Sequence, residues 1–486
     1  MRSPSADWRA LTATVLGARP LDDPRVAPAA QAAVEDFLAS SLMARHDPAV
    51  TRLLDHARAQ GVPARPRTVV GHGDGASAAL AALVGGFQAH LLDVDDTHAH
   101  VRGHPSAVLL PALLAVAEDG TDGRRLLAAY AVGVEVMARL GRLLGPAHYE
   151  AGWHTTGTAG PLAGAFACSH LLGLDVEQTA TAVSLAASQA GGIRAQFGTQ
   201  AKPLQAGLAS QSAVQATGLA RAGVEANPDF LEPSTGFLAA HGVGDDLAEL
   251  TDGWGTSWRV VDPGLWMKRY PFCSAAMSAS DAAAEVAAAL ARQVTDSGAP
   301  APDGPAGGTP ANGAPTAIDR GAGIERVAVR VRPGADTALR HTRPRTGEEG
   351  RFSAEYVVAL HLAGYEPTLE HFTPAPPAPE VARLVERTTR EHVPAGPEDA
   401  ALRAGERSFW AEVVVTLAGG REVRAAVEHP LGSPRNPLGG GARRAKLVDA
   451  TGSEVAAAAV RAAVAALPTG TVGSLVGTVR DAVAPG

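Results

Sequence analysis

Apolar residues along the first half of the chain recur every three or four positions, which is the spacing of one face of an α-helix. The clearest example runs through Leu126, Leu127, Tyr130, Val134 and Met137. Asp175 and Gln178 have the spacing of a capping box, which predicts a helix that includes Thr179–Ala190. Such segments follow one another, with short Gly/Pro breaks, up to about residue 265. We therefore predict that this part of the chain is all-helical.

The hydrophobic pattern changes after about Trp266. Ile324–Arg332 alternates valines with arginines, which predicts a strand, and Trp410–Leu417 and Arg421–Val427 predict a hairpin that turns at Gly419-Gly420. Helical patterns lie between these strands, at Met277–Leu290, Ala354–Leu362 and Pro379–Thr388. We expect a smaller α+β domain in which antiparallel strands carry helices on one face.

The predicted fold is mainly α with a second, α+β domain, and its boundaries follow from these changes. Residues 1–266 form the N-terminal part of the helical domain, and residues 267–435 form the α+β lid domain. Residues from about 295 to 323 contain almost no large apolar side chain and predict a disordered Pro/Gly-rich insertion. Residues 436–486 return to alanine-rich helical sequence, and we expect them to rejoin the helical domain.

Composition narrows the class of protein. With 486 residues, of which 46% are hydrophobic, the chain is long enough for more than one globular core. The net charge of −8 argues against general affinity for nucleic acid or anionic membrane. No apolar run is long enough to span a bilayer, and the N-terminus has no signal-peptide core. Cys168 and Cys273 make neither a disulfide scaffold nor the ligand set of an iron–sulfur cluster. We expect a cytoplasmic protein that binds neither nucleic acid nor membrane.

The stretch from His90 to His104 is the richest in groups that carry chemistry. Asp93, Asp95 and Asp96 lie between two apolar helical segments, where a carboxylate is costly to bury without a partner. The cluster suits a divalent cation, but it equally suits the orientation of histidines for acid/base work, or a loop of helix caps. Spacing alone leaves all three interpretations open.

Three other polar positions stand out. His154 lies between glycine and threonine residues, where histidine is commonly structural. Lys202 precedes a proline that starts a helix of small residues, and it is far from any other lysine in this arginine-rich chain. Such lysines are usually exposed, although an anion site at a helix N-terminus needs one. Lys268 lies beside Tyr270 at the apparent domain junction.

Taken in order, these segments resemble the MmgE/PrpD family. The match extends from about residue 70 to 470, and its motifs fall at Asp93–His98, His104–Ser106, Gly133–Val136, Arg139–Leu140, Trp153–Thr155, Lys202–Leu204, Lys268–Cys273, Gly347–Ser353 and Gly432–Leu438. Each motif is moderately specific by itself, whereas all of them in register are strongly specific.

The resemblance implies a large helical domain made from both chain ends, an α+β lid and a site in the cleft between them. It also implies a homodimer that uses no metal and no cofactor. Family members include 2-methylcitrate dehydratases, cis-aconitate decarboxylases and an iminodisuccinate epimerase, which share proton transfer at a carbon next to a carboxylate. The leading expectation is therefore a cofactor-free lyase, a dehydratase or decarboxylase, whose substrate is a small di- or tricarboxylate.

By motif position, the resemblance assigns the catalytic residues His154, Lys202, His104, Asp93 and Thr97. It implies that Lys202 and His104 bind carboxylate and stabilise charge, that His154 transfers protons, and that Asp93 and Thr97 orient the histidines and bind the substrate. The substrate-binding residues that it implies are Lys268, Tyr270, Gln205, Met277 and Arg340.

Two positions lack a histidine of the family pattern, and a third position differs from it. Met277 and Gln205 stand where the family has histidines, and Arg340 or His341 stands where it often has tyrosine. Methionine cannot transfer a proton or pair with an anion. The second hypothesis is therefore an isomerase, epimerase or cyclase of a specialised biosynthetic pathway, acting on a less charged substrate. The third is a catalytically inactive family member with a binding role.

Overall fold

The computed structural model describes residues 4–484 except 62, 74, 232–233, 243–246, 297–322, 395 and 397–408. The chain divides into two compact units, of which unit 1 comprises residues 1–269 and 437–486 and unit 2 comprises residues 270–436. The boundaries predicted after residues 266 and 435 lie within three residues of these divisions. Apart from its ends, the insertion predicted at about 295–323 lies outside the described residues.

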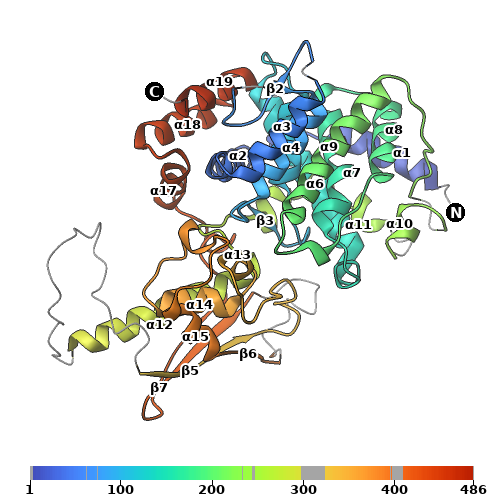
Figure 1. Ribbon diagram of the computed structural model, residues 1–486. Coiled ribbons are helices and arrows are strands. Elements are labelled where there is room, and N and C mark those ends of the chain that lie inside the picture. The colour runs from blue at the N-terminus through green and yellow to red at the C-terminus, as the bar shows by residue number, and fades with distance from the viewer. Residues whose placement is uncertain are drawn as a thin grey trace. The chain divides into compact units, whose positions relative to one another are not determined.

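Unit 1 is built mainly of helices (Figure 1). Those before residue 270 are α1 (Pro4–Leu16), α2 (Val26–Ala44), α3 (Pro48–Ala59), α4 (Ala78–His90), α5 (Ser106–Val116), α6 (Gly123–Glu150), α7 (Thr155–Leu172), α8 (Val176–Ala187), α9 (Ala201–Arg221), α10 (Phe237–Ala240) and α11 (Ala248–Thr251). The chain returns with α17 (Gly440–Thr451), α18 (Glu454–Ala466) and α19 (Val472–Ala482). The predicted mainly α fold, with a helical domain made from both chain ends, is confirmed.

Two short antiparallel strand pairs are exceptions to the all-helical prediction. β1 (Arg67–Thr68) pairs with β2 (Gly75–Ala76), and β3 (Thr97–His98) pairs with β4 (Leu265–Trp266). The second pair joins segments far apart in the sequence. No helix among the described residues is both long enough and apolar enough to span a membrane.

Local signals set several of these helices. The face of α6 predicted from apolar spacing is fully buried, and the capping box of Asp175 and Gln178 opens α8 as predicted.

α4 and α9 approach closely because two glycines meet between them: a Cβ on Gly86 would lie 2.8 Å from the Cα of Gly207. Small side chains thus allow two polar helix ends, at His90 and Lys202, to share one region.

The C-terminal helices complete the core of unit 1. Leu447 of α17, Val460 of α18 and Leu475 of α19 belong to the same buried cluster as Phe37 and Leu38 of α2. Burial of about 25 cal/mol per Å² of apolar surface makes such a docking favourable.

Unit 2 is an α+β unit. Its sheet has the order β6 (Thr388–His392), β5 (Ile324–Val331), β7 (Ala411–Leu417) and β8 (Glu422–Val427). Three helices lie on the same side of that sheet in Figure 1, namely α12 (Met277–Asp296), α14 (Ala354–Leu362) and α15 (Pro379–Glu386), and the one-turn α13 (Gly347–Gly350) precedes α14. β7 and β8 form the predicted hairpin, because Gly419 and Gly420 both have the positive φ that its turn requires.

The expectation of a purely antiparallel sheet is wrong. β5 and β6 are parallel, with Val327 opposite Thr388 and Val331 opposite His392. Parallel neighbours need a crossover connection, and the chain from α13 to α15 runs between these two strands. Thr388, predicted as the end of a helix, instead starts β6, which contains no apolar residue to signal a strand.

Candidate active site

The candidate site is built on the loop between α4 and β3. Its three aspartates, Asp93, Asp95 and Asp96, are 3%, 0% and 0% exposed, so this is not a solvated loop. Asp93 adopts a left-handed backbone conformation, with φ of 53°. A non-glycine residue in this conformation is held there by its surroundings, which commonly happens at functional sites.

Two lysines hold the Asp93 carboxylate. The Nζ of Lys202, in the first turn of α9, lies 2.6 Å from Asp93 Oδ1. The Nζ of Lys268, just after β4, lies 3.3 Å from the same oxygen and donates to the Asp93 backbone carbonyl at 2.6 Å. Burial by itself would raise the pKa of Asp93, but the two ammonium groups outweigh it and hold that pKa well below its usual value. A single carboxylate oxygen therefore marks a place where two cations converge.

The Asp95 carboxylate orients two histidines. His90 Nδ1 lies 3.0 Å from both Asp95 oxygens, and His104 Nδ1 lies 3.1 Å from Asp95 Oδ2 and 3.0 Å from the Asp96 carbonyl. We assign the proton to Nδ1 of each ring from these acceptors, which leaves each Nε2 as the basic nitrogen. His104 Nε2 lies 3.7 Å from Asp93 Oδ1. Burial lowers the pKa of His104 to about 3, so its imidazole is neutral.

His154 receives its orientation from Gln205. It is the N-cap residue of α7, and its Nδ1 lies 2.7 Å from Gln205 Oε1. Gln205 Nε2 donates to the Ile193 carbonyl at 3.1 Å, so Oε1 must accept from His154 Nδ1–H. Burial, reinforced by the Lys202 ammonium, lowers the pKa of His154 well below its usual value. His154 therefore offers a neutral ring with a bare Nε2, 6.3 Å from the His90 ring between centroids.

Three helices begin at this cluster. His104 lies two residues before α5, His154 caps α7, and Lys202 is the second residue of α9. The N-terminus of a helix carries partial positive charge and attracts anions. The helix ends and the two lysines thus act in the same sense, and the arrangement suits a negatively charged ligand.

The structure brings most of the predicted site residues together. Asp93, His104, His154, Lys202, Lys268 and Gln205 lie in the contacts above, and Thr97 is buried on β3. Tyr270, Met277 and Arg340 belong to unit 2. There the Tyr270 hydroxyl donates to Glu366 at 3.0 Å, Met277 is buried at the start of α12, and Arg340 is exposed. Their part in the site stays a prediction.

The assignment by motif position left out several residues that complete the cluster. His90 and Asp95, which lie in the Asp-rich stretch singled out in the sequence, carry part of its hydrogen bonding. Lys446 of α17 also reaches this loop at the Val94 carbonyl, and Asp36 of α2 is the ion-pair partner of Lys446. Neither lies in a motif that would have indicated it.

The same side chains raise the question of a metal ion. His90, Asp93, Asp95 and His104 each offer a donor atom within 4.8 Å of the others. The donor types would fit a transition metal such as zinc. However, two ammonium groups already face the Asp93 oxygen, and both Asp95 oxygens accept from imidazoles. A cation would have to displace these partners, so the electrostatics favour an anion.

We expect activity to survive exhaustive chelation, because the aspartates serve to orient histidines and lysines. Elemental analysis of the purified protein should then show no stoichiometric metal. Loss of activity with EDTA that one divalent ion reverses would contradict this prediction.

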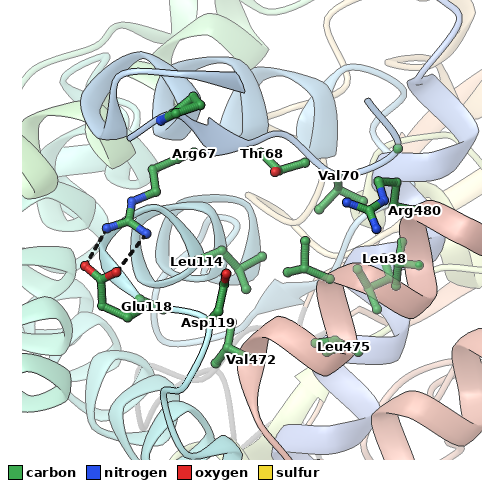
Figure 2. A pocket seen from close by; sticks show the side chains of 15 residues that line it. Leu38, Arg67, Thr68, Val70, Leu114, Glu118, Asp119, Val472, Leu475 and Arg480 are labelled. Atoms are coloured by element: carbon green, nitrogen blue, oxygen red, sulfur yellow. Dashed lines mark hydrogen bonds and ion pairs between the residues drawn. The ribbon is translucent and has the colours of Figure 1, made fainter. Parts of the chain in front are cut away.

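A pocket elsewhere in unit 1 has different walls. It lies between β1, the end of α5 and α19, with an apolar lining that includes Leu114 and Leu475 (Figure 2). At its rim Arg67 donates to Glu118 at 2.7 Å, so that guanidinium is already paired. None of the candidate site residues lines this pocket.

Comparisons with known proteins agree with the motifs. Residues 9–250 match the family model described as the MmgE/PrpD N-terminal domain, and residues 270–467 match the MmgE/PrpD C-terminal domain. Cis-aconitate decarboxylase of Mus musculus is 30% identical over 367 residues, covering 74% of this chain and 68% of the mouse protein. The Homo sapiens protein of that name is 34% identical over 212 residues, 42% of this chain and 44% of its own. A cis-aconitate decarboxylase-like protein of Aspergillus oryzae is 28% identical over 349 residues, 67% of each chain.

Proposed function

The chain belongs to the MmgE/PrpD family, and on that basis we propose that it is a lyase acting on a small di- or tricarboxylate by proton transfer next to a carboxylate. The relatives named cis-aconitate decarboxylase support a lyase, and among lyases they favour decarboxylation over dehydration. As the family resemblance implies, we propose that the protein works in the cytoplasm as a homodimer, without metal or cofactor.

One observation carries this proposal: two buried ammonium groups meet one carboxylate beside imidazoles with oriented Nε2 atoms. In the absence of substrate, Asp93 balances Lys202 and Lys268. A substrate carboxylate near the same ammonium groups would share them with Asp93. Cations in a site with little water stabilise developing negative charge far better than they would in water.

The residues then divide the work as follows. Lys202 and Lys268 bind a carboxylate and stabilise the enolate-like charge that forms next to it. His154 exchanges a proton through Nε2, because Gln205 holds its other nitrogen. Asp95 keeps His104 in the tautomer whose Nε2 faces the same region. Because the resting imidazole is neutral, its Nε2 is unprotonated and can accept a proton, which it then returns as the imidazolium.

Both lyase reactions fit this set of groups. In decarboxylation the electrons of the broken C–C bond delocalise toward the remaining carboxylate, CO₂ leaves, and a carbon gains a proton. In dehydration a base removes the proton next to the carboxylate, and the hydroxyl leaves with a proton from an acid. Each needs one cationic pocket and positioned proton carriers, and neither requires a redox step.

The test is an assay of the purified protein with cis-aconitate, 2-methylcitrate and citrate, following products by NMR. Loss of CO₂ or of water from one of these acids at enzymatic rates supports the proposal. A rearranged or epimerised product would favour the isomerase instead. Binding of the acids without any turnover would favour an inactive family member.

We expect Gln205→Glu to move the pH profile of kcat/KM to higher pH. A carboxylate beside His154 Nδ1 favours the imidazolium and raises its pKa by about 1–3 units. The variant then stays protonated to a higher pH, so the limb that His154 controls moves upward whether it acts as acid or base. Gln205→Leu is the control for charge: it removes the acceptor of His154 Nδ1–H without adding a carboxylate, so it should lower kcat/KM without moving that limb upward. Identical limbs in the wild type and Gln205→Glu would remove His154 from the proton transfer.

The isomerase, epimerase or cyclase remains the second candidate, because two polar positions of the family are changed. Gln205 is committed to His154 and Ile193 and does not titrate, and Met277 replaces a histidine by motif position. If Met277 contacts the substrate, that substrate carries an apolar group in place of one carboxylate.

For this candidate, we expect Met277→His to weaken the native reaction, because it places a polar ring against an apolar group. Turnover of 2-methylcitrate or cis-aconitate should rise in the same variant. The measurement is kcat/KM for both substrates in wild type and variant. Wild-type turnover of either acid at rates usual for enzymes would contradict this reading of Met277.

A further inference from the structure

A third lysine reaches the candidate site from the far end of the chain. Lys446, on α17, is 1% exposed, and its Nζ donates to the Val94 carbonyl at 2.7 Å. The same Nζ donates to Asp36 Oδ1 on α2 at 2.6 Å. Lysine is seldom fully buried unless it is paired, so this placement calls for a physical reason.

The lysine content of the chain makes this contact notable. Lysine and arginine together number 42, and only three of these are lysines: Lys202, Lys268 and Lys446. All three are buried, and each one contacts Asp93 or Val94. Everywhere else the chain uses arginine. A compact ammonium with three donors can satisfy converging carbonyl and carboxylate oxygens where a planar guanidinium cannot.

Two of these lysines hold the backbone of the loop in a complementary way. Lys268 donates to the carbonyl of Asp93 and Lys446 to the carbonyl of Val94, the next residue. Between them they fix two successive peptide units of the loop in which Asp93 has a positive φ. Since that conformation is costly for a non-glycine residue, loss of one anchor leaves the loop free to relax.

The charges around Lys446 also favour a role for this lysine at the loop. Asp36, Asp95 and Asp96 are all buried and interact with one another, and burial together with Asp36 raises the pKa of Asp96 to about 8. Asp96 is satisfied by Ser106, whose backbone N–H and hydroxyl both donate to it. Lys446 supplies the cation for Asp36, so Asp36 can remain buried near the two loop aspartates.

We propose that Lys446 is a positioning residue, which through Val94 holds Asp93 where Lys202 and Lys268 meet it. The C-terminal segment of the chain thus contributes to the site as well as to the core. This inference rests on the proposed function for its effect on rate. Its competing explanation is a buried ion pair that only fastens α17 to α2.

Three variants separate the two explanations. Asp36→Asn breaks the ion pair but leaves Lys446 able to donate to Val94. Lys446→Met breaks the pair and removes that donor. Asp36→Leu combined with Lys446→Met replaces both charges with apolar side chains, an exchange that usually leaves stability unchanged or raised. The melting temperature and steady-state kinetics are measured for each, with the substrate identified by the assay above.

The positioning role predicts that the double variant keeps a melting temperature near the wild type while kcat falls by about 10- to 100-fold, the scale expected when reacting groups are displaced by roughly 1 Å. KM should change less than kcat, and Asp36→Asn should keep most of the wild-type kcat. A double variant that is stable and keeps wild-type kcat would overturn the proposal.

A crystal structure of the double variant tests the positioning role of Lys446 without any substrate. The inference predicts that Asp93 loses its positive φ or that Lys202 Nζ moves away from its 2.6 Å contact with Asp93 Oδ1. An unchanged loop would overturn it even if the variant were slow. If the wild type turns over none of the acids, the proposed function fails, and the loop geometry still tests Lys446.

Discussion

Replacing His154 with alanine should lower kcat by about 100-fold or more, the usual scale for loss of a general acid or base. The ring is buried at the start of α7, Gln205 fixes its tautomer, and its pKa is low enough to keep it neutral. Alanine retains the backbone of the cap but removes the proton carrier. Because His154 makes no ion pair among the described residues, KM should change less than kcat.

The matched control lies on the same helix. His170, in the last turn of α7, is half-buried, and its Nε2 lies 3.3 Å from the Ala18 carbonyl. His170→Ala removes an imidazole from the opposite end of α7 and should leave kcat within about two-fold of wild type, as expected for a residue outside the chemistry. Equal losses in the two variants would show that the effect of His154→Ala comes from destabilising α7. Retention of wild-type turnover in His154→Ala would assign the proton transfer to His104 or His90.

Much of the fold was predictable because its signals are local. The apolar spacing in α6, the capping box at Asp175 and the glycine pair of the β7–β8 hairpin each lie within a few residues. β6 was missed because its five residues lack an alternating apolar pattern, and its direction depends on the crossover from β5. Pairing partners and strand direction are properties of the assembled sheet.

In the candidate site, too, the residues that carry local signals were predictable, whereas their meeting in space was not. His104, His154 and Lys202 stand at helix starts, and the family motifs supply their order. Prolines follow His104 and Lys202 in the sequence, whereas no proline or capping pattern marks the start at His154. Their meeting at Asp93 could not be derived from spacing, because it depends on helices packing together. Two of the interpretations left open for the aspartate cluster apply to different residues. Asp93 and Asp95 contact lysines and histidines, whereas Asp96 accepts the backbone N–H of Ser106 at the start of α5, as a helix cap does.

Lys446 shows where prediction from sequence ends. Its contact with Val94 spans 352 residues and its contact with Asp36 spans 410. Nothing around it distinguishes it from the arginines nearby. Only the return of α17 to α2 gives it a role, and the scarcity of lysine in the chain becomes informative once all three lysines are seen at one loop.

The second large effect is expected at Lys202. Lys202→Met should lower kcat by about 100- to 1,000-fold, the scale found when one preorganised group that stabilises transition-state charge is removed. The methionine keeps the length and apolar stem of the side chain, so α9 should keep its packing. Asp93 would retain Lys268 as a partner, and its pKa should rise because one of the two cations that lower it is gone.

Two further variants, Lys202→Arg and Arg221→Met, test whether the loss of kcat in Lys202→Met comes from the geometry at Asp93 or from the loss of a positive charge. Arginine restores the charge but not the compact ammonium 2.6 Å from Asp93 Oδ1, so it should recover only a small part of the activity. Arg221, exposed in the last turn of α9, lies at the opposite end of the same helix, and its replacement by methionine removes a positive charge without touching the cluster. Full activity in Lys202→Arg would mean that net charge, and not the geometry at Asp93, governs the reaction. Wild-type kcat in Lys202→Met would refute the anion site itself, because Lys202 makes the closest ammonium contact to the Asp93 carboxylate on which that site is inferred.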